Sequence, residues 1–227
     1  MTGSKFKVFV ARTFDRFGLS LSRKTRLELV ERGHEFAGLV KAIGKHSVID
    51  DQCLLMLWQF ANSAVALKGD VAEMGVYKGG SARLLAKAFG GDAKKTVFLF
   101  DTFSGMPAID PAKDINREGD FSDTSLESVQ EFLKDCPNVV LYKGLFSETL
   151  SNVAGKTFCF VHIDCDIHQS VRECCQFLYP RMTRGGYMIF DDYVHIPGVK
   201  RAIDEFFSDK IERPVLVPRS QCLIIKR

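Results

Sequence analysis

The chain has 227 residues, of which 46% are hydrophobic and 26% are charged, and its formal net charge is +3. This length suits one α/β domain with an N-terminal extension better than two full domains. The small net charge gives no reason to expect nucleic acid as a partner, and no apolar run approaches the length of a membrane span. Seven cysteines without a Cys-x-x-Cys pair indicate reduced, mostly buried thiols. We therefore expect a cytoplasmic protein.

Residues 1–68 mix charged and apolar side chains at helical spacing. Within them, the segment 50–58 starts with two aspartates and continues with an apolar face, as a helix start does. We expect this N-terminal helical region to serve as a substrate lid or an oligomer contact, and a homo-oligomer is compatible with it. The second region, residues 69–227, differs in character.

From residue 69 the chain alternates short apolar runs with helical stretches, which is typical of βαβ units. The pattern predicts strands near residues 70–75, 96–101, 139–143, 157–163, 186–190, 214–217 and 221–226. It predicts helices near residues 79–89, 124–135, 146–152, 169–182 and 198–209. Several of these strands look buried on both faces, as central parallel strands are. The predicted fold is a doubly wound, Rossmann-like α/β sheet, mostly parallel, with one antiparallel strand from a terminal pair.

Residues 102–123 interrupt this alternation with a polar stretch rich in Gly, Pro and Asp. Loops of this length in compact domains are often functional, for example as a lid over a ligand.

A glycine-rich turn follows the first predicted strand, with Glu73, Gly75, Gly79 and Ser81 in it. Glycines there let the backbone approach a ligand and let a helix pack closely on its strand. The spacing is not Gly-x-Gly-x-x-Gly, and a carboxylate suits a cationic ligand better than a pyrophosphate. The turn therefore favours S-adenosylmethionine (SAM) over NAD, and a plain strand–helix turn is the alternative.

Asp101 ends the next predicted strand. An acid at that place in nucleoside-binding α/β folds accepts hydrogen bonds from ribose hydroxyls, although aspartate is also common in turns and helix caps.

Carboxylates gather after the fourth and fifth strands of the predicted sheet. Asp164 and Asp166 follow one strand, and Asp191 and Asp192 follow the next. Parallel strands end at the same edge of the sheet, where ligands bind. Carboxylates brought together there would repel unless some stay protonated or a hard cation such as Mg²⁺ binds. Helix capping explains one acid for each helix start but not both pairs, so we predict a metal site.

Three histidines lie near these acids. His162 falls within a predicted strand, which indicates a hydrogen-bonded core imidazole. His168 and His195 flank the acidic pairs and are candidates for a base, a ligand or a substrate contact.

Together these motifs make the chain resemble the macrocin O-methyltransferase (TylF-type) family over roughly residues 50–212. The resemblance is carried by six segments in order, at residues 69–81, 100–107, 119–124, 144–150, 163–166 and 185–193. It implies a Rossmann methyltransferase that uses SAM and Mg²⁺ to methylate a sugar hydroxyl, with residues 69–227 as the SAM-binding catalytic domain. Departures from the family pattern are His168 in place of Tyr and His162 in place of Arg.

By this resemblance, the methionine end of SAM would contact Glu73, Gly75, Gly79 and Ser81. Asp101 would hold the ribose, and Phe103, Gly144 and Phe146 would shape the adenine pocket. The family's metal-binding acids correspond to Asp164, Asp191 and Asp192. Asp164 is also the first candidate for the base.

The mechanism that we expect is an in-line transfer of the sulfonium methyl group to a hydroxyl oxygen. A metal would bind two neighbouring hydroxyls of the acceptor, and a carboxylate or His168 would take the proton. Three alternatives remain open from sequence: a metal-dependent O-methyltransferase acting on a catechol-like or lipid-linked hydroxyl, an NAD- or nucleotide-sugar-binding oxidoreductase, and a non-catalytic protein on the same fold.

Overall fold

The structure, a computed structural model, describes residues 33–91 and 95–227. What the sequence predicts for residues 1–32 lies outside this range. The chain divides into two compact units, residues 1–35 and 36–227, and the second unit holds the whole sheet. The sequence places a boundary between residues 68 and 69, but the compact unit already begins at Phe36. The reason is that helix α3 (Asp51–Ala64) buries its apolar face against the sheet domain, where it contacts α4, β4 and β5.

One seven-stranded sheet forms the centre of this unit, in the order β3-β2-β1-β4-β5-β7-β6. Its strands are β1 (Asp70–Met74), β2 (Val97–Asp101), β3 (Val139–Lys143), β4 (Phe158–Ile163), β5 (Met182–Phe190), β6 (Val215–Leu216) and β7 (Cys222–Ile225). Neighbouring strands from β3 to β5 pair in parallel. Strand β7 is antiparallel to both β5 and β6. The predicted doubly wound sheet with one antiparallel strand is confirmed.

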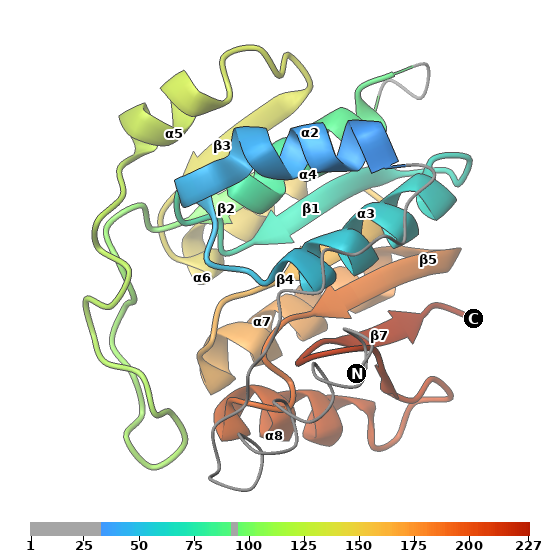
Figure 1. The fold of residues 1–227 in the computed structure, drawn as a ribbon. Coiled ribbons are helices and arrows are strands. Elements are labelled where there is room, and N and C mark those ends of the chain that lie inside the picture. Colours follow the sequence, from blue (N-terminus) through green and yellow to red (C-terminus); the bar gives the residue numbers. More distant parts are fainter. Residues whose placement is uncertain (1–32, 92–94) are drawn as a thin grey trace, which may run out of the picture. The chain divides into compact units, whose positions relative to one another are not determined.

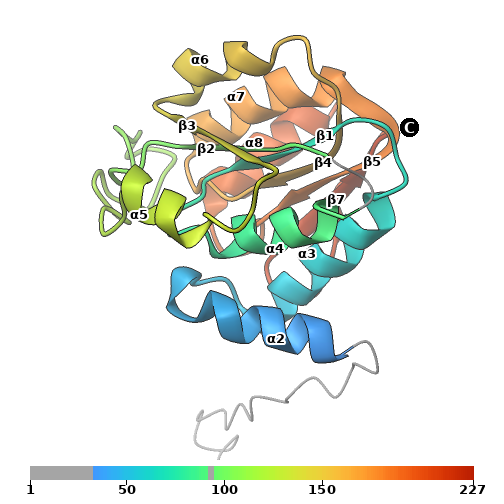
Figure 2. The same cartoon turned by 90° about the horizontal axis from the view of Figure 1, so that it is seen from above.

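Helices cover both faces of the sheet. Helix α3 and helix α4 (Gly80–Phe89) lie on one face (Figure 2). Helices α6 (Phe146–Thr149), α7 (His168–Leu178) and α8 (Pro197–Phe207) lie on the other (Figure 2). The described residues also form α2 (Gly33–Ile43), α5 (Leu126–Phe132) and short 3-10 turns at Gly44–His46, Leu150–Val153 and Tyr179–Arg181.

The sequence extends the helix after β4 to residue 182, but α7 ends at Leu178. Pro180 lies in the following 3-10 turn. Proline has no N–H to continue the α-helical hydrogen bonds, so the chain leaves the helix there. Strand β5 then begins at Met182, four residues before its predicted start.

The core lies between the sheet and its helices. All six residues of β4 are buried, as is expected of a central strand covered on both faces. Phe100, Phe158, Phe160 and Phe190 are fully buried there, and burial of each such side chain contributes roughly 1.5–3 kcal/mol. Among the described helices, none is long and apolar enough to cross a membrane.

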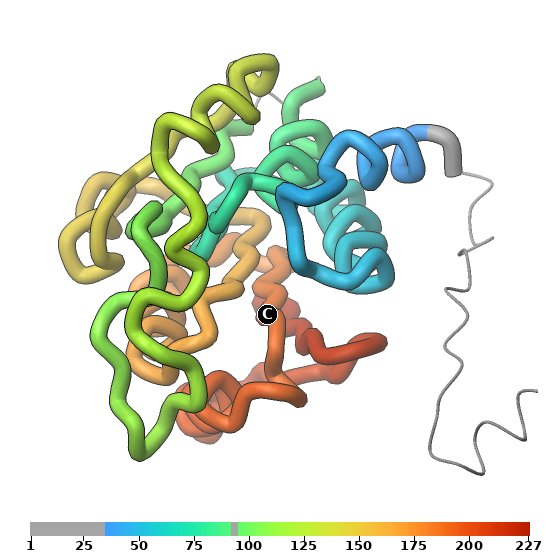
Figure 3. Tube along the Cα trace, turned by 60° about the vertical axis from the view of Figure 1, so that its left-hand side comes forward, coloured from blue at the N-terminus to red at the C-terminus, as the bar shows by residue number. Residues whose placement is uncertain are grey.

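The parallel strands point toward one edge of the sheet, and the loop of residues 102–123 lies on that side (Figures 1 and 3). The order of strands reverses between β1 and β4, since β2 and β3 extend in one direction and β4 and β5 in the other. In open α/β sheets, ligands bind outside the carboxyl ends of the strands at such a reversal. The fold therefore places a candidate site at the ends of β1 and β4.

Candidate active site

A cavity of about 320 Å³ opens at this edge of the sheet, a size within the usual range of small-molecule sites. Its walls come from the turn after β1, the ends of β2, β3 and β4, the loop 102–123 and the start of α7. Six residues predicted for cofactor, metal or catalysis line it: Gly75, Ser81, Asp101, Gly144, Phe146 and Asp164. Residues that are far apart in sequence thus meet in one pocket.

Gly75 brings the ends of β1 and β4 together. Its φ is +89°, and a Cβ atom at this position would lie 1.9 Å from the carbonyl oxygen of Asp164. The two segments are also joined by the Asp164 N–H, which donates to the carbonyl of Met74 at 2.8 Å. Only a residue without a side chain fits this crossing, so Gly75 positions Asp164 at the cavity wall.

Asp101 fixes the backbone of the glycine-rich turn. Its Oδ2 accepts from the N–H groups of Val76 (2.7 Å) and Tyr77 (2.9 Å), and its Oδ1 accepts from the N–H of Phe103 (2.7 Å). Each carboxylate oxygen has further acceptor capacity, so the ribose contact stays a prediction. The structure shows a second role for Asp101, which is to stabilise the backbone conformation of the glycine-rich turn. Tyr77 needs this support because its φ is +51°.

Three predicted cofactor contacts lie behind the surface. Of the described residues that line the cavity, none is Glu73, Gly79 or Phe103. Gly79 instead precedes α4 with φ at +87°. Phe103 is only 2% exposed, and Glu73 is fully buried and hydrogen-bonded to His162. Their contacts with the cofactor stay predictions.

Four aspartates follow β4 and β5. Ligand atoms of Asp164, Asp166 and Asp192 all lie within 4.8 Å of one another, and Asp164 and Asp191 belong to a second such group with His162. Asp166 and Asp192 have positive φ values of +55° and +54°, a strained conformation that is typical of functional sites. We call these four residues the acidic cluster.

The pKa values in the acidic cluster are raised first by burial and then by repulsion between the carboxylates. Removal from water, followed by the charges of Asp191 and Asp166, raises the pKa of Asp164 well above its ordinary value. The same two causes, burial and then the charges of Asp192 and Asp191, raise the pKa of Asp166 to about 7. Burial and the charge of Asp191 also raise the pKa of Asp192.

A divalent cation fits this cluster. The donors are carboxylate oxygens, which are the ligands that Mg²⁺ and similar hard ions prefer. Their mutual repulsion is the property that a bound cation would relieve. Asp164 belongs to both groups, so a cation at Asp164 could be shared with Asp166 and Asp192 on one side and Asp191 on the other.

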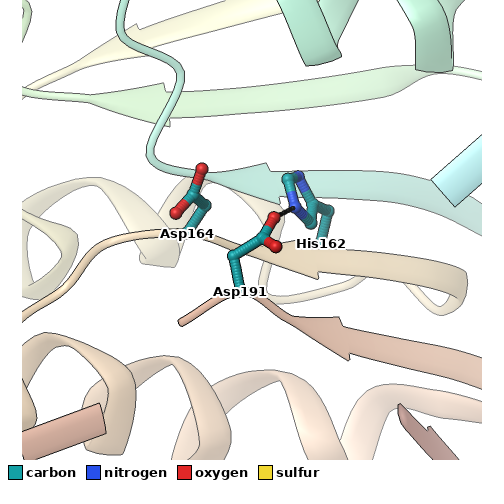
Figure 4. Close-up of side chains that lie close together, drawn as sticks. All are labelled: His162, Asp164 and Asp191. Carbon is teal, nitrogen blue, oxygen red and sulfur yellow. Dashed lines mark hydrogen bonds and ion pairs between the residues drawn. The ribbon is translucent and has the colours of Figure 1, made fainter. Parts of the chain in front are cut away.

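His162 lies next to the acidic cluster, inside β4 as predicted. Its Nε2 is 2.7 Å from Asp191 Oδ2, and its Nδ1 is 2.9 Å from Glu73 Oε1. Figure 4 shows the Asp191 carboxylate between the imidazole ring and Asp164. Burial opposes a charge on this ring, but hydrogen bonds to Asp191 and Glu73 outweigh it and raise the pKa of His162 well above its ordinary value.

The structure places His168 away from the cavity. The side chain is 4% exposed, and its Nε2 lies 3.3 Å from Glu205 Oε2 of α8. Its backbone N–H donates to Asp114 Oδ1 at 2.8 Å, and it is not among the described residues that line the cavity. His195 is 67% exposed and lies 3.7 Å from Asp192. The geometry therefore favours a carboxylate over His168 as the base.

The cavity also contains residues for which the sequence offers no specific role. The His46 ring stacks on Phe132 with centroids 3.7 Å apart, and His46 and Tyr77 both line the cavity. Phe121, from the loop 102–123, lines it as well and packs edge-on against Tyr77. The polar composition of this loop was the signal available for Phe121. Nothing in the local sequence indicates that residues 44–49 return to the glycine-rich turn.

Comparisons with known proteins agree with this geometry. The family model for macrocin O-methyltransferase (TylF) matches residues 41–222. Demethyldecarbamoylnovobiocin O-methyltransferase of Streptomyces niveus is 29% identical over 151 residues, 61% of this chain and 58% of that protein. Mycinamicin III 3''-O-methyltransferase of Micromonospora griseorubida is 30% identical over 182 residues, 71% of this chain and 70% of that protein.

Among solved structures, that of the O-methyltransferase NovP superposes with a TM-score of 0.70 at 25% identity, covering 80% of this chain and 82% of that one. A calicheamicin methyltransferase superposes with a TM-score of 0.68 at 18% identity, covering 86% and 93%, and supports the fold. The match spans less than two thirds of the novobiocin enzyme. The family model nevertheless covers most of the chain with its cavity-forming motifs, so the chain belongs to the macrocin O-methyltransferase (TylF) family.

Proposed function

We propose that this chain transfers the methyl group of SAM to a sugar hydroxyl of a small molecule, with a divalent cation, Mg²⁺ in the first instance, bound at the acidic cluster. The observation that carries the proposal is the position of Asp164. This residue lines the cavity and belongs to both groups of carboxylates, and the glycine-rich turn and Asp101 line the same cavity. Cofactor and acceptor sites would therefore adjoin.

The relatives support a sugar as the acceptor. The mycinamicin enzyme is named as a 3''-O-methyltransferase, and a Streptomyces olivaceus relative is named for methylation of a rhamnosyl group at the 4' oxygen. Family membership favours methyl transfer over the oxidoreductase alternative. A cytoplasmic location and a homo-oligomer stay predictions.

A cation held by Asp164, with Asp192 and Asp191, would supply Lewis acidity to the acceptor hydroxyl. Asp166 lines the same cavity and is held by Asn116 Nδ2 at 3.3 Å. We assign the proton to Asp166, because its carboxylate lines the cavity one residue beyond Asp164 and is not needed as one of the three cation ligands. The oxygen–carbon bond forms as the carbon–sulfur bond breaks. The sulfonium becomes a neutral thioether, and the hydroxyl proton moves to the carboxylate.

The test is methyl transfer from SAM to a panel of glycosides with free neighbouring hydroxyls, with mass spectrometry of both products. Metal-stripped enzyme with and without added Mg²⁺ forms the second arm. We expect product that depends on Mg²⁺ and on a sugar hydroxyl. Full activity after chelation would contradict the cation, and thermal stabilisation by NAD but not by SAM would contradict the cofactor.

A further inference from the structure

Three buried side chains form a line across the centre of the sheet toward the acidic cluster. Glu73, His162 and Asp191 come from β1, β4 and the residue after β5. Glu73 and His162 are side by side in the parallel register, which places both on one face of the sheet. The His162 ring bridges the two carboxylates at 2.9 Å and 2.7 Å, and all three residues are 5% exposed or less.

The bridge defines which way the Asp191 carboxylate turns. His162 Nε2 binds Oδ2 of Asp191, which leaves Oδ1 free of the ring, and the Asp191 side chain lies between the ring and Asp164 (Figure 4). The ring is held in turn by Glu73 Oε1 at its other nitrogen. An imidazole fixed at both nitrogens cannot rotate without breaking a buried hydrogen bond, so the orientation of Asp191 depends on Glu73 through His162.

Burying these three side chains lowers the stability of the fold, so close packing alone does not explain why they are present. Three ionisable side chains are buried where apolar ones would be equally stable or more stable. In addition, Glu73 Oε2 is buried and finds no hydrogen-bond partner among the described residues, which is itself unfavourable. Buried polar groups of this kind around a metal site commonly orient the ligands of the metal.

We propose that His162 is a positioning residue of the cation site, which fixes the orientation of the Asp191 carboxylate beside Asp164, and that Glu73 fixes the His162 ring. The inference rests on the proposed function in taking the acidic cluster to be a cation site. Glu73 then acts through the sheet and not by touching SAM, in contrast to its predicted contact with the methionine end.

The experiment measures Mn²⁺ affinity by electron paramagnetic resonance and S-adenosylhomocysteine affinity by calorimetry without metal, in full-length protein. We expect H162L to weaken Mn²⁺ binding by roughly 10- to 100-fold, with S-adenosylhomocysteine affinity within about twofold of wild type. H162Q keeps a donor for Asp191 and should recover part of the loss. V161A is the matched control, because Val161 is the buried neighbour of His162 in β4; it lowers stability without changing Mn²⁺ affinity.

Glu73→Gln provides a second route should H162L fail to fold. This variant keeps an acceptor for the ring but removes the charge, and we expect weaker Mn²⁺ binding with the cofactor site intact. In the D191N background, H162Q should have little further effect, since the two residues act in one chain. Unchanged Mn²⁺ affinity in folded H162L or E73Q would overturn this inference but not the proposed cation site. The same holds if either variant loses affinity for Mn²⁺ and for S-adenosylhomocysteine equally. Absence of Mn²⁺ binding in the wild type would overturn the proposed cation site and the inference together.

Discussion

Asp166 and Asp164 are separated by one residue but have different surroundings. Asp164 is tied through its backbone to β1 and belongs to both groups of carboxylates, whereas Asp166 accepts a hydrogen bond from Asn116 in the loop 102–123. The first position suits a cation ligand and the second suits proton transfer. Only their environments distinguish them, because the side chains are chemically identical.

Replacement of Asp166 by asparagine tests this division. We expect D166N to lower kcat by about 10²- to 10⁴-fold, as loss of a general base does, with the KM for SAM little changed. Steady-state kinetics with Mg²⁺ present measures both values. D209N is the control, since Asp209 is 75% exposed and its ion-pair partner among the described residues is Lys210. A fall in kcat of less than about tenfold would assign the proton to another group.

Gly75 offers a test of backbone geometry at the residue scale. G75A combines a positive φ with a Cβ atom 1.9 Å from the Asp164 carbonyl oxygen, so we expect a loss of roughly 2–5 kcal/mol in the free energy of unfolding. Gly119 has a similar φ of +85° with nothing within 4 Å. G119A should cost only about 1–2 kcal/mol. Urea unfolding of both variants measures the difference. Equal losses would show that the short distance between residue 75 and the Asp164 carbonyl does not add to the loss of stability.

At the scale of elements, one aspartate of the long loop connects the loop to α7 and also binds within the loop. Asp114 is 6% exposed. Its Oδ1 accepts from the N–H of His168 at the start of α7, and its Oδ2 accepts from the N–H of Asp110. Gly198 of α8 also lies against this segment, since a Cβ there would be 2.6 Å from the Lys113 carbonyl oxygen. The loop is thus fastened beside the acidic cluster.

D114A should release this part of the loop. We expect a loss of about 1 kcal/mol, as for an N-terminal helix cap, faster cleavage within residues 102–123 in limited proteolysis, and a higher KM for the acceptor. D120A is the control, because Asp120 Oδ2 accepts from the nearby N–H of Arg117 within the same loop. Identical proteolysis of the two variants would mean that Asp114 does not fasten the loop.

At the scale of the whole molecule, Glu212 joins the last strand to the end of α7. It accepts from the backbone N–H of Arg227 (3.0 Å) and from the Tyr179 hydroxyl (2.6 Å), and it is 3% exposed. Burial opposes its ionisation, but these hydrogen bonds outweigh burial and lower the pKa of Glu212 to about 2. Because the folded pKa lies below the unfolded value, the stabilisation is complete above about pH 4.5 and is lost as the pH falls toward 2.

The difference between these pKa values corresponds to at most about 3 kcal/mol. We therefore expect E212Q to be less stable than wild type at pH 7, and this gap to close as the pH falls from 5 to 2. Unfolding free energies across this range provide the measurement. A gap that stays constant with pH would mean that the Glu212 charge contributes nothing.

The sequence by itself determined the order of strands and helices, because periodicity and turn residues are local properties. It also placed Asp101, Asp164, Asp191 and Asp192 at strand ends, where a parallel sheet gathers them at one edge. Family motifs extended this to methyl transfer. Helix ends were less predictable, as the early end of α7 at Leu178 illustrates.

Tertiary structure decided which of these residues face the cavity. Glu73 and Gly75 are two residues apart in one motif, yet Glu73 is buried beside His162 while Gly75 lines the pocket. His168 follows the acidic pair but turns toward Glu205, and His46 returns to the site from an earlier segment. Local sequence encodes the position of a residue on its element. Contacts between elements set where its side chain points, because strand register and helix packing bring together residues that are many positions apart.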